Sequence, residues 1–136
     1  MRAAVFRGRK ILLVQERTDG LWTLPGGWAD VNDSPSEAVA KEVRQESGFQ
    51  VKVERLLAVF DRAKHPHDPP FPFHIYKMFF QCEIEGGEAT PSAETSSVEF
   101  FGPESLPPLS LSRITGEQIQ FCFRAGLNAT VPTAFD

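Results

Sequence analysis

Short runs rich in β-branched and aromatic residues, separated by glycine and proline signals, dominate the pattern along the chain. Ala3 to Arg7 and Ile11 to Arg17 are two such runs on either side of Gly8-Arg9-Lys10, which predicts a β-hairpin at the start. Further strands are expected in four runs: Leu21 to Leu24, Val51 to Arg62, Phe73 to Glu85 and Val98 to Phe101. A turn is expected at Gly86-Gly87, after the third of these runs.

Two segments carry helical signals instead. Ser34-Pro35-Ser36-Glu37 combines a capping hydroxyl, a proline in the first turn and a glutamate three residues after the serine, which is the pattern of a capping box, and Gly48 ends this helix. Thr115 is expected to cap a second helix with one buried face, formed by Ile119, Phe123 and Leu127 at i, i+4 and i+8. Strands and helices together predict a mixed α/β fold in one domain, residues 1–136.

Composition and charge narrow the classes of partner. With 41% hydrophobic and 24% charged residues the chain has a globular composition, and its net charge is -4 with no run of Lys or Arg, so a nucleic-acid polymer is not expected to bind. Cys82 and Cys122 have no CxxC spacing, which favours free thiols in a reducing compartment. Neither a signal peptide nor an apolar run of membrane-spanning length is present, which indicates a cytoplasmic protein without a membrane partner.

Candidate chemistry concentrates on the helix from Ser34 to Ser47. At about 100° per residue, Glu42 and Glu46 project from one side with Gln45 beside them, while Val39 and Val43 form the adjoining apolar stripe. Carboxylates at the rim of a buried helix are hard oxygen ligands that suit Mg²⁺ or Mn²⁺. The same spacing also fits two ordinary surface carboxylates, so only the sequence around them separates the two interpretations.

That surrounding sequence resembles the Nudix box. The family's pattern is Gly, five residues, Glu, seven residues, Arg-Glu, an aliphatic residue, any residue, Glu-Glu, any residue, Gly and an apolar residue. Six positions fall on this pattern in register: Gly27, Glu42, Val43, Glu46, Gly48 and Phe49.

Three positions depart from the family's pattern. Asp33 stands for the first Glu and Lys41 for the Arg, and a short ion pair between them that orients the loop on the helix is expected to survive both changes. Gln45 replaces a glutamate that usually helps to hold metal, and a neutral amide offers one oxygen and no charge. Weaker metal binding or lost activity is expected to follow.

Resemblance to one branch of the family extends over most of the chain. Leu21 to Asp30, Asp61 to His67 and Leu109 to Thr115 look like the bacterial ADP-ribose and CDP-choline pyrophosphatase-like branch. This resemblance implies a Nudix fold, a mixed β-sheet between α-helices, which hydrolyses a nucleoside diphosphate linked to another moiety. It also implies Mg²⁺ or Mn²⁺ as cofactor, a small-molecule substrate and a homodimer.

The resemblance further implies roles for particular residues. Glu42 and Glu46 would be metal ligands at a site that includes position Gln45, and a backbone carbonyl of Gly26 or Gly27 could add another ligand. Lys41 would orient the box. The catalytic base is either Glu46 or a carboxylate outside the box, where Glu94 is ranked above Glu99.

Other side chains are candidates for binding substrate. Arg62 could pair with a phosphate, or else with Asp61 or a nearby glutamate. His65 and His67 flank a proline on a loop and could hydrogen-bond a phosphate, or else be solvated.

Aromatic residues offer further candidates. One of Trp22 and Trp28, which bracket the glycine turn, is expected to line the pocket and the other to pack under the helix; Trp28 is the substrate-binding candidate. Five aromatic residues could include a stacking platform but are expected mostly in the core: Phe71, Phe73, Tyr76, Phe79 and Phe80.

Three functions are compatible with these residues. The first is metal-dependent hydrolysis of a nucleoside diphosphate derivative such as ADP-ribose or CDP-choline. The second is pyrophosphohydrolysis of nucleoside triphosphates, which would release inorganic pyrophosphate. The third is a catalytically weakened nucleotide-binding domain, in which Gln45 has eroded the metal site.

Overall fold

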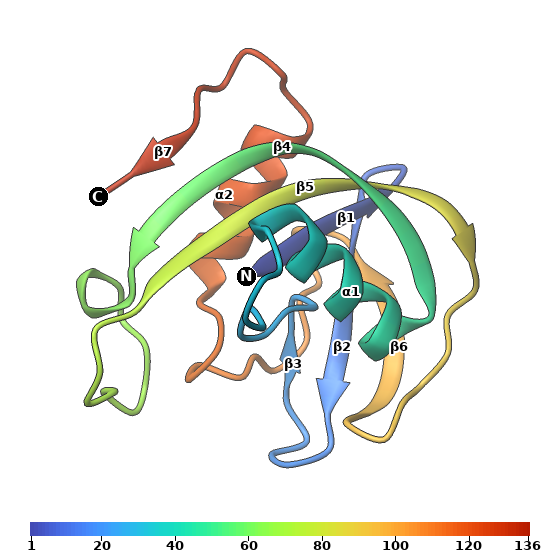
Figure 1. Ribbon diagram of the computed structural model, residues 1–136, viewed down its shortest axis with the longest axis horizontal. Coiled ribbons are helices and arrows are strands. Elements are labelled where there is room, and N and C mark those ends of the chain that lie inside the picture. Colours follow the sequence, from blue (N-terminus) through green and yellow to red (C-terminus); the bar gives the residue numbers. More distant parts are fainter.

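The strands form one mixed sheet in the computed structural model, which describes residues 1–136 (Figure 1). The sheet order is β3-β2-β1-β5-β4-β7, with β6 paired to the other side of β2. β1 pairs with β5 and β4 with β7 in parallel, and all other pairs are antiparallel. The strands are β1 (Arg2–Arg7), β2 (Lys10–Glu16), β3 (Trp22–Thr23), β4 (Phe49–Asp61), β5 (Tyr76–Gly87), β6 (Thr95–Phe101) and β7 (Ala134–Phe135). The predicted N-terminal hairpin is confirmed by the pairing of β1 with β2.

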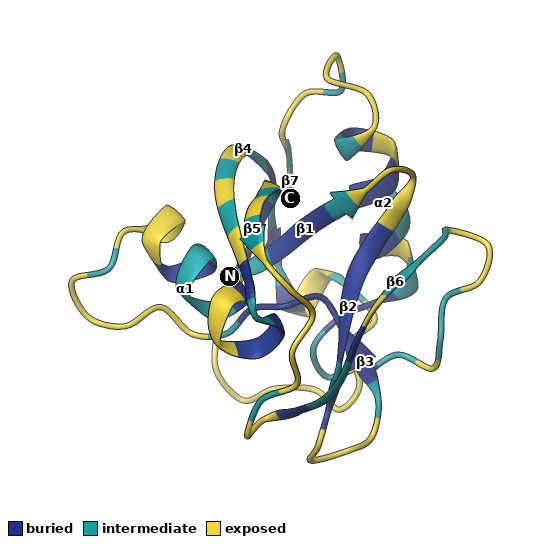
Figure 2. Ribbon diagram, turned by 90° about the vertical axis from the view of Figure 1, so that its right-hand side faces the viewer, coloured by how far each residue is buried: buried dark blue, intermediate teal, exposed yellow.

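Two helices cover the sheet, α1 (Pro35–Ser47) and α2 (Gly116–Gly126), and the 3-10 turn η1 (Arg62–Lys64) follows β4. Figure 2 shows α1 and α2 on opposite sides of the molecule with the buried strands β1 and β2 between them. This arrangement confirms the predicted mixed α/β class with a sheet between helices. Neither helix has the length and apolar character needed to cross a membrane.

Alternation along the central strands creates a separate core under each helix. Ala3 and Val5 of β1 pack in the cluster that contains Val39 and Val43 of α1. Ala4, between them, belongs to the cluster that contains the buried residues of α2. Because side chains on a strand point alternately to opposite faces, one strand can bury both faces only if every position is apolar.

The start and end of α1 follow from its local sequence. Ser34 and Glu37 form the predicted capping box, and Gly48 ends the helix with φ +81°. A Cβ atom at Gly48 would lie 2.5 Å from the carbonyl oxygen of Glu88. Glycine is therefore needed there both for the left-handed backbone and for the close approach of the chain that follows β5.

The helix α2 is shorter than its apolar pattern suggests. Thr115 caps it together with the side chain of Gln118, as the capping prediction requires, and Ile119 and Phe123 are buried. Leu127 is the C-cap residue and is 45% exposed, so the prediction that it completes the buried face is wrong. The helix ends at Gly126, one residue before the third repeat of the pattern.

The strand β5 differs from its prediction at both ends. It begins at Tyr76 rather than Phe73, and Gly86 and Gly87 are its last residues, paired with Gln50 and Phe49, rather than a turn. Phe79 and Phe80 lie in the core, as expected. The expectation that the aromatic residues are mostly core is wrong for the other three, Phe71, Phe73 and Tyr76, which are exposed before or at the strand start.

Candidate active site

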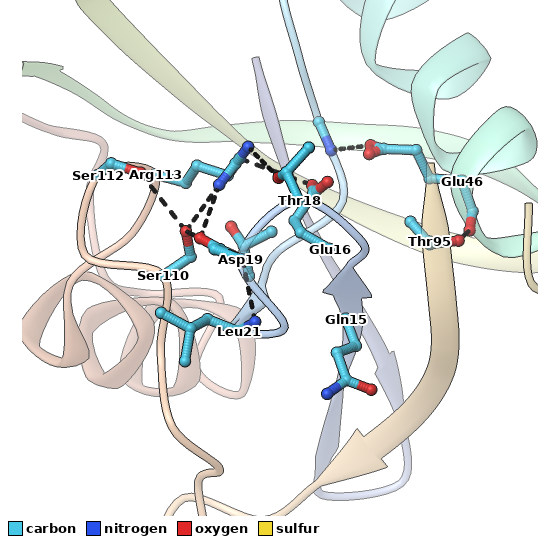
Figure 3. Close-up of polar contacts among 12 residues, drawn as sticks. Gln15, Glu16, Thr18, Asp19, Leu21, Glu46, Thr95, Ser110, Ser112 and Arg113 are labelled. Carbon is cyan, nitrogen blue, oxygen red and sulfur yellow. Dashed lines mark hydrogen bonds and ion pairs between the residues drawn. The ribbon is translucent and has the colours of Figure 1, made fainter. Parts of the chain in front are cut away.

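The carboxylates of α1 meet the glycine turn that follows β3. Glu46 is 2% exposed, and its Oε1 accepts a 2.8 Å hydrogen bond from the Gly26 amide (Figure 3). Glu42 lies against the next residue, since a Cβ atom at Gly27 would be 3.1 Å from Glu42 Oε2. The paired glycines therefore let the backbone approach both carboxylates.

Strand β1 holds this turn in place. The Ala3 amide donates to Pro25 O at 2.8 Å and the Gly27 amide donates to Met1 O at 3.0 Å. The Gly27 carbonyl accepts from the Met1 amino group at 2.8 Å, whereas no hydrogen bond reaches the carbonyl of Gly26. Of the two carbonyls considered from the sequence, that of Gly26 is thus the one available to a ligand.

Burial raises the pKa values of the carboxylates in this cluster. Desolvation raises the pKa of Glu46 to about 8, although the hydrogen bond from Gly26 and the charge of Arg2 act in the opposite direction. The pKa of Glu42 is raised by burial and then by the charges of Glu94 and Asp30. A divalent cation would relieve both causes, because it supplies positive charge where carboxylates are crowded and poorly solvated.

The donor set fits a magnesium-like ion. Mg²⁺ keeps several waters and is commonly bound by one or two carboxylates together with substrate phosphates. Glu42 and Glu46 provide two carboxylates, and the Gly26 carbonyl provides a third oxygen ligand. No three His, Cys, Asp or Glu side chains gather closely enough to hold a metal without such help. Gln45 is exposed on α1 and makes no side-chain hydrogen bond.

Lys41 fixes the loop that precedes α1. Its Nζ pairs with Asp33 and, at 2.7 Å, with Oδ2 of Asp30. The hydrogen bonds that Lys41 donates to both aspartates raise the pKa of Lys41. The expected Lys41–Asp33 ion pair is therefore present, and Asp30 is a second partner that the sequence comparison did not suggest.

Glu94 lies just before β6, and its charge acts on the cluster from outside α1. Its side chain is exposed, and its charge contributes to the raised pKa values of both Glu42 and Glu16. The next residue, Thr95, is buried and donates from Oγ1 to the Glu46 carbonyl at 2.7 Å (Figure 3). The segment that carries Glu94 is thus tied to the last turn of α1.

A cavity of about 730 Å³ opens beside the glycine turn. Its aromatic wall includes Trp28, which is 70% exposed and lies 6.4 Å from the ring of Phe71, and also Tyr76. The lining residues are Met1, Arg2, Gly27, Trp28, Ala29, Arg62, Pro69, Phe71, Ile75, Tyr76, Lys77, Ser112 and Arg113. Trp22, by contrast, packs edge-on against Phe101 in the core beneath α2.

Basic side chains form the remaining wall. Arg62 donates from Nη2 to Pro69 O at 2.9 Å and to Ser112 O at 3.1 Å, and Lys77 Nζ donates to the carbonyl of Arg113. Arg62 makes no ion pair with Asp61 or with a glutamate. Burial and the charges of Arg2 and Arg62 lower the pKa of Lys77 to about 6.

Arg113 joins this wall to the loop after β2. It pairs with Asp19 at 3.0 Å and with Glu16 at 3.7 Å, and Ser110 Oγ also donates to Asp19, as Figure 3 shows. Burial raises the pKa of Glu16. Unlike Arg62 and Lys77, Arg113 already has carboxylate partners.

His65 and His67 lie outside the cavity lining. His65 Nε2 lies 3.0 Å from Asp136 Oδ2, and His67 Nδ1 lies 2.8 Å from Leu111 O. Burial and then the charge of Lys77 lower the pKa of His67 to about 4, so its ring is neutral near neutral pH and Nδ1 donates to Leu111 O. The structure brings together Gly26, Gly27, Glu42, Glu46 and Glu94, and places Arg62 and Trp28 on the adjoining cavity.

Sequence reasoning did not select Arg2, Lys77, Arg113 or Glu16. Lys77 enters the site because β4 and β5 pair with Phe60 opposite Lys77, and Arg113 enters through the loop before α2. One feature of the sequence could have indicated Lys77 as a site residue: it is a lysine at an inward position of a strand that is otherwise rich in aromatic residues.

Comparison with known proteins identifies the family. A model of the NUDIX domain matches residues 1–122. The chain belongs to the NUDIX domain family. The match includes both the glycine turn and all of α1, and therefore the whole carboxylate cluster.

Two relatives of this Nudix chain carry related names. The Bacillus subtilis (strain 168) protein named "Putative ADP-ribose pyrophosphatase YjhB" is 44% identical over 136 residues, which are 100% of this chain and 65% of that protein. An ADP-ribose pyrophosphatase of Methanocaldococcus jannaschii is 31% identical over 107 residues, 76% of this chain and 61% of that protein. The Nudix chain thus spans less than two thirds of the length of these relatives.

Solved structures agree with the fold. A crystal structure of an ADP-ribose pyrophosphatase from Streptococcus suis 89-1591 has a TM-score of 0.89 and 44% identity, and the match covers 99% of this chain and 96% of that chain. A crystal structure of UDP-X diphosphatase has a TM-score of 0.89 and 36% identity, with coverage of 99% and 64%. The predicted Nudix fold is confirmed by both.

Proposed function

We propose that the chain hydrolyses the diphosphate linkage of a nucleoside diphosphate joined to another moiety, with Mg²⁺ or Mn²⁺ as cofactor. One observation carries this proposal: the carboxylates of Glu42 and Glu46 meet a glycine turn whose Gly27 also lines a cavity with aromatic and basic walls. A metal site for phosphates therefore adjoins space for the rest of a nucleotide.

Different residues are proposed to bind the metal and to act as the base. Glu42, Glu46 and the Gly26 carbonyl would hold the cation, which when bound polarises phosphorus and lowers the pKa of bound water. Glu94 is the proposed base, since its charge acts on Glu42 from the residue before β6 and its side chain is exposed to solvent. A carboxylate oxygen of Glu94 would accept the proton of the attacking water.

The aromatic wall suits a nucleobase. Trp28 and Phe71 have ring centroids 6.4 Å apart at an interplanar angle of 39°, and both are exposed. Flat apolar rings at a cavity wall stack on other rings through offset or edge contacts. The base is therefore proposed to bind along Trp28 while the diphosphate reaches Gly27.

Names of relatives favour a diphosphate compound over a triphosphate. The Streptococcus suis and Methanocaldococcus jannaschii proteins are named for ADP-ribose, and the other solved structure is named for UDP-X. ADP-ribose is accordingly the first substrate to test. The expected cytoplasmic location and homodimer belong to the same proposal, and the buried free thiols of Cys82 and Cys122 agree with a reducing compartment.

The residue at position 45 is expected to influence both the affinity of the metal site and turnover. Its side chain is exposed on the same helix as Glu42 and Glu46, so a glutamate there could add a carboxylate without repacking the core. We expect Gln45→Glu to tighten Mg²⁺ binding and raise turnover. Arg44→Gln, at the adjacent exposed position, is the matched control, because it makes the same change in net charge at the box position that accepts any residue.

The direct test is a substrate panel. Phosphate released after coupling to a phosphatase would be measured for ADP-ribose, CDP-choline and nucleoside triphosphates, with Mg²⁺, Mn²⁺ or a chelator. Metal-dependent turnover of a diphosphate compound to two monophosphates is expected. Release of inorganic pyrophosphate from triphosphates alone would replace this function with the triphosphate alternative. If neither wild type nor Gln45→Glu hydrolyses any compound of the panel, the result would favour the third alternative, a nucleotide-binding domain with weakened catalysis.

A further inference from the structure

Two buried basic side chains lie side by side on the cavity wall. Arg62 donates to the carbonyl of Ser112, and Lys77 donates to the next carbonyl along the chain, that of Arg113. Both residues are 8% exposed and both line the cavity. Consecutive carbonyls on one loop therefore fix the two positive side chains at one place.

Neither of these basic side chains has an anionic partner. The ion pairs of the structure involve other basic groups, namely Lys41, His65, His74 and Arg113. Their hydrogen bonds are to backbone carbonyls, and Lys77 also approaches Nε2 of the neutral His67 at 3.3 Å. Burying a charge without a counter-ion is unfavourable, so an arrangement of this kind is suited to a ligand that brings negative charge.

The carboxylate cluster differs from these two basic side chains in what it needs to bind a phosphate. Glu42 and Glu46 need a cation before they can hold a phosphate, because carboxylates repel it. Arg62 and Lys77 need no metal, because Arg offers a planar fork of donors and Lys three donors to tetrahedral oxyanions. Arg2 also lines the cavity, and its charge acts on both Glu46 and Lys77.

We propose that Arg62 and Lys77 form a metal-independent anion subsite that takes one phosphoryl group of the substrate while the carboxylate cluster holds the metal. The inference rests on the proposed function in that it places two parts of one substrate in the same cavity. It assigns recognition of negative charge to the protein's own side chains and not to the metal alone.

The subsite has a pH signature because Lys77 can lose its proton. The groups that face it are Arg2 of β1, Arg62 of η1, His67 of the following loop, Cys122 of α2 and the Met1 amino group. Burial and neighbouring positive charge favour the neutral amine in the empty site. Anion binding must therefore be accompanied by proton uptake above about pH 6, and affinity falls as pH rises.

Inorganic sulfate is a suitable probe, because it resembles a phosphoryl group and does not titrate near neutral pH. Sulfate would be titrated into the full chain in the presence of a chelator, with amide NMR shifts followed for residues of the cavity. Saturable shifts at Lys77 and Ser112 are expected. Lys77→Met should weaken the affinity at least about tenfold, whereas the exposed Lys64→Met, which removes the same charge nearby, should change it less than about twofold.

Lys77→Arg separates the charge from its titration. Arginine stays protonated at all accessible pH values, so the affinity of this variant for sulfate should fall less between pH 6 and pH 8 than the affinity of wild type does. The change that remains in the variant is the one due to the Met1 amino group, whose pKa burial lowers to about 6. Lys77→Gln serves as a second neutral variant if Lys77→Met does not fold. Absence of saturable shifts in the wild type, or equal affinity of wild type and both neutral variants, would overturn the subsite.

The two proposals fail in different ways. Metal-dependent hydrolysis without sulfate binding at Lys77 would remove the subsite and leave the enzyme. Sulfate binding without hydrolysis of any panel compound would keep the subsite and remove the proposed reaction.

Discussion

Glu46→Gln isolates the energetic cost of a buried acid at the centre of the site. The amide retains an oxygen that can accept from the Gly26 amide, as Oε1 of Glu46 does at 2.8 Å, but it cannot ionise. Burial raises the pKa of Glu46 from 4.5 to about 8. The substitution should therefore stabilise the metal-free protein at alkaline pH even though it removes a proposed metal ligand.

The size of the effect follows from proton linkage. Below pH 4.5 both folded and unfolded states hold the proton, and between 4.5 and about 8 only the folded state holds it. Stability therefore falls as pH rises through this window, by about 1.4 kcal/mol per pH unit. From pH 5 to pH 8 the advantage of Glu46→Gln over wild type should grow by roughly 4 kcal/mol.

The reasoning is tested by the difference in unfolding free energy between Glu46→Gln and wild type, and not by how the wild-type value alone changes with pH. The pKa of Lys77 is lowered to about 6, so above that pH the unfolded state binds more protons at this site and stability rises with pH. This opposes the contribution of Glu46 over part of the window. Because both variants contain Lys77, its contribution cancels when their unfolding free energies are subtracted.

Urea unfolding followed by tryptophan fluorescence, in a chelator, near pH 5, 6.5 and 8 measures this difference. Glu99→Gln is the matched control, since it makes the same change at an exposed glutamate on β6. Added Mg²⁺ at pH 8 should stabilise wild type more than Glu46→Gln, because it binds the native carboxylate. A constant difference between Glu46→Gln and wild type across the pH range would refute the reasoning.

Three further substitutions test the supports of the site. Thr95→Val removes the hydroxyl that donates to the Glu46 carbonyl, and it should lower the unfolding free energy by about 1–3 kcal/mol in urea; Thr95→Ser should restore it, and equal stability of all three proteins would contradict the role. Gly27→Ala places a methyl group 3.1 Å from Glu42 Oε2, so Mg²⁺ binding measured by calorimetry should weaken while stability changes by less than about 1 kcal/mol; unchanged Mg²⁺ affinity would contradict the packing. Gly48→Ala should lower thermal stability by at least about 2 kcal/mol, since its backbone is left-handed; a neutral effect would contradict the close approach.

Local signals were sufficient for the part of the site on α1. Ser34, Glu37 and Gly48 specify where the helix begins and ends, and a helix of fixed register places Glu42 and Glu46 on one side. The box pattern then predicted the meeting with the glycine turn. The caps and the helix register span few residues, so local sequence expresses them. The meeting of Glu46 with Gly26 joins positions 20 residues apart, and only the family pattern predicted it.

The basic wall of the cavity depends on contacts between distant segments. Lys77 reaches it through the register of β4 and β5, which contains bulges between Gln50 and Val51 and at two further points. Such irregularities change which face a residue occupies and leave no clear local signal. Phe71 and Phe73 are exposed although their hydrophobicity predicts the core. The cavity that Phe71 lines, and the packing of Phe73 against Phe71, depend on distant segments and are not visible in the sequence.

Turnover by Glu46→Gln, at saturating Mg²⁺ and with the preferred diphosphate substrate, tests the central claim most directly. We predict a fall in kcat of at least about 100-fold, from the loss of a metal ligand, in a variant that is folded and, in the absence of metal, more stable than wild type at pH 8. Unaltered turnover in Glu46→Gln would contradict the claim that this carboxylate cluster carries the reaction.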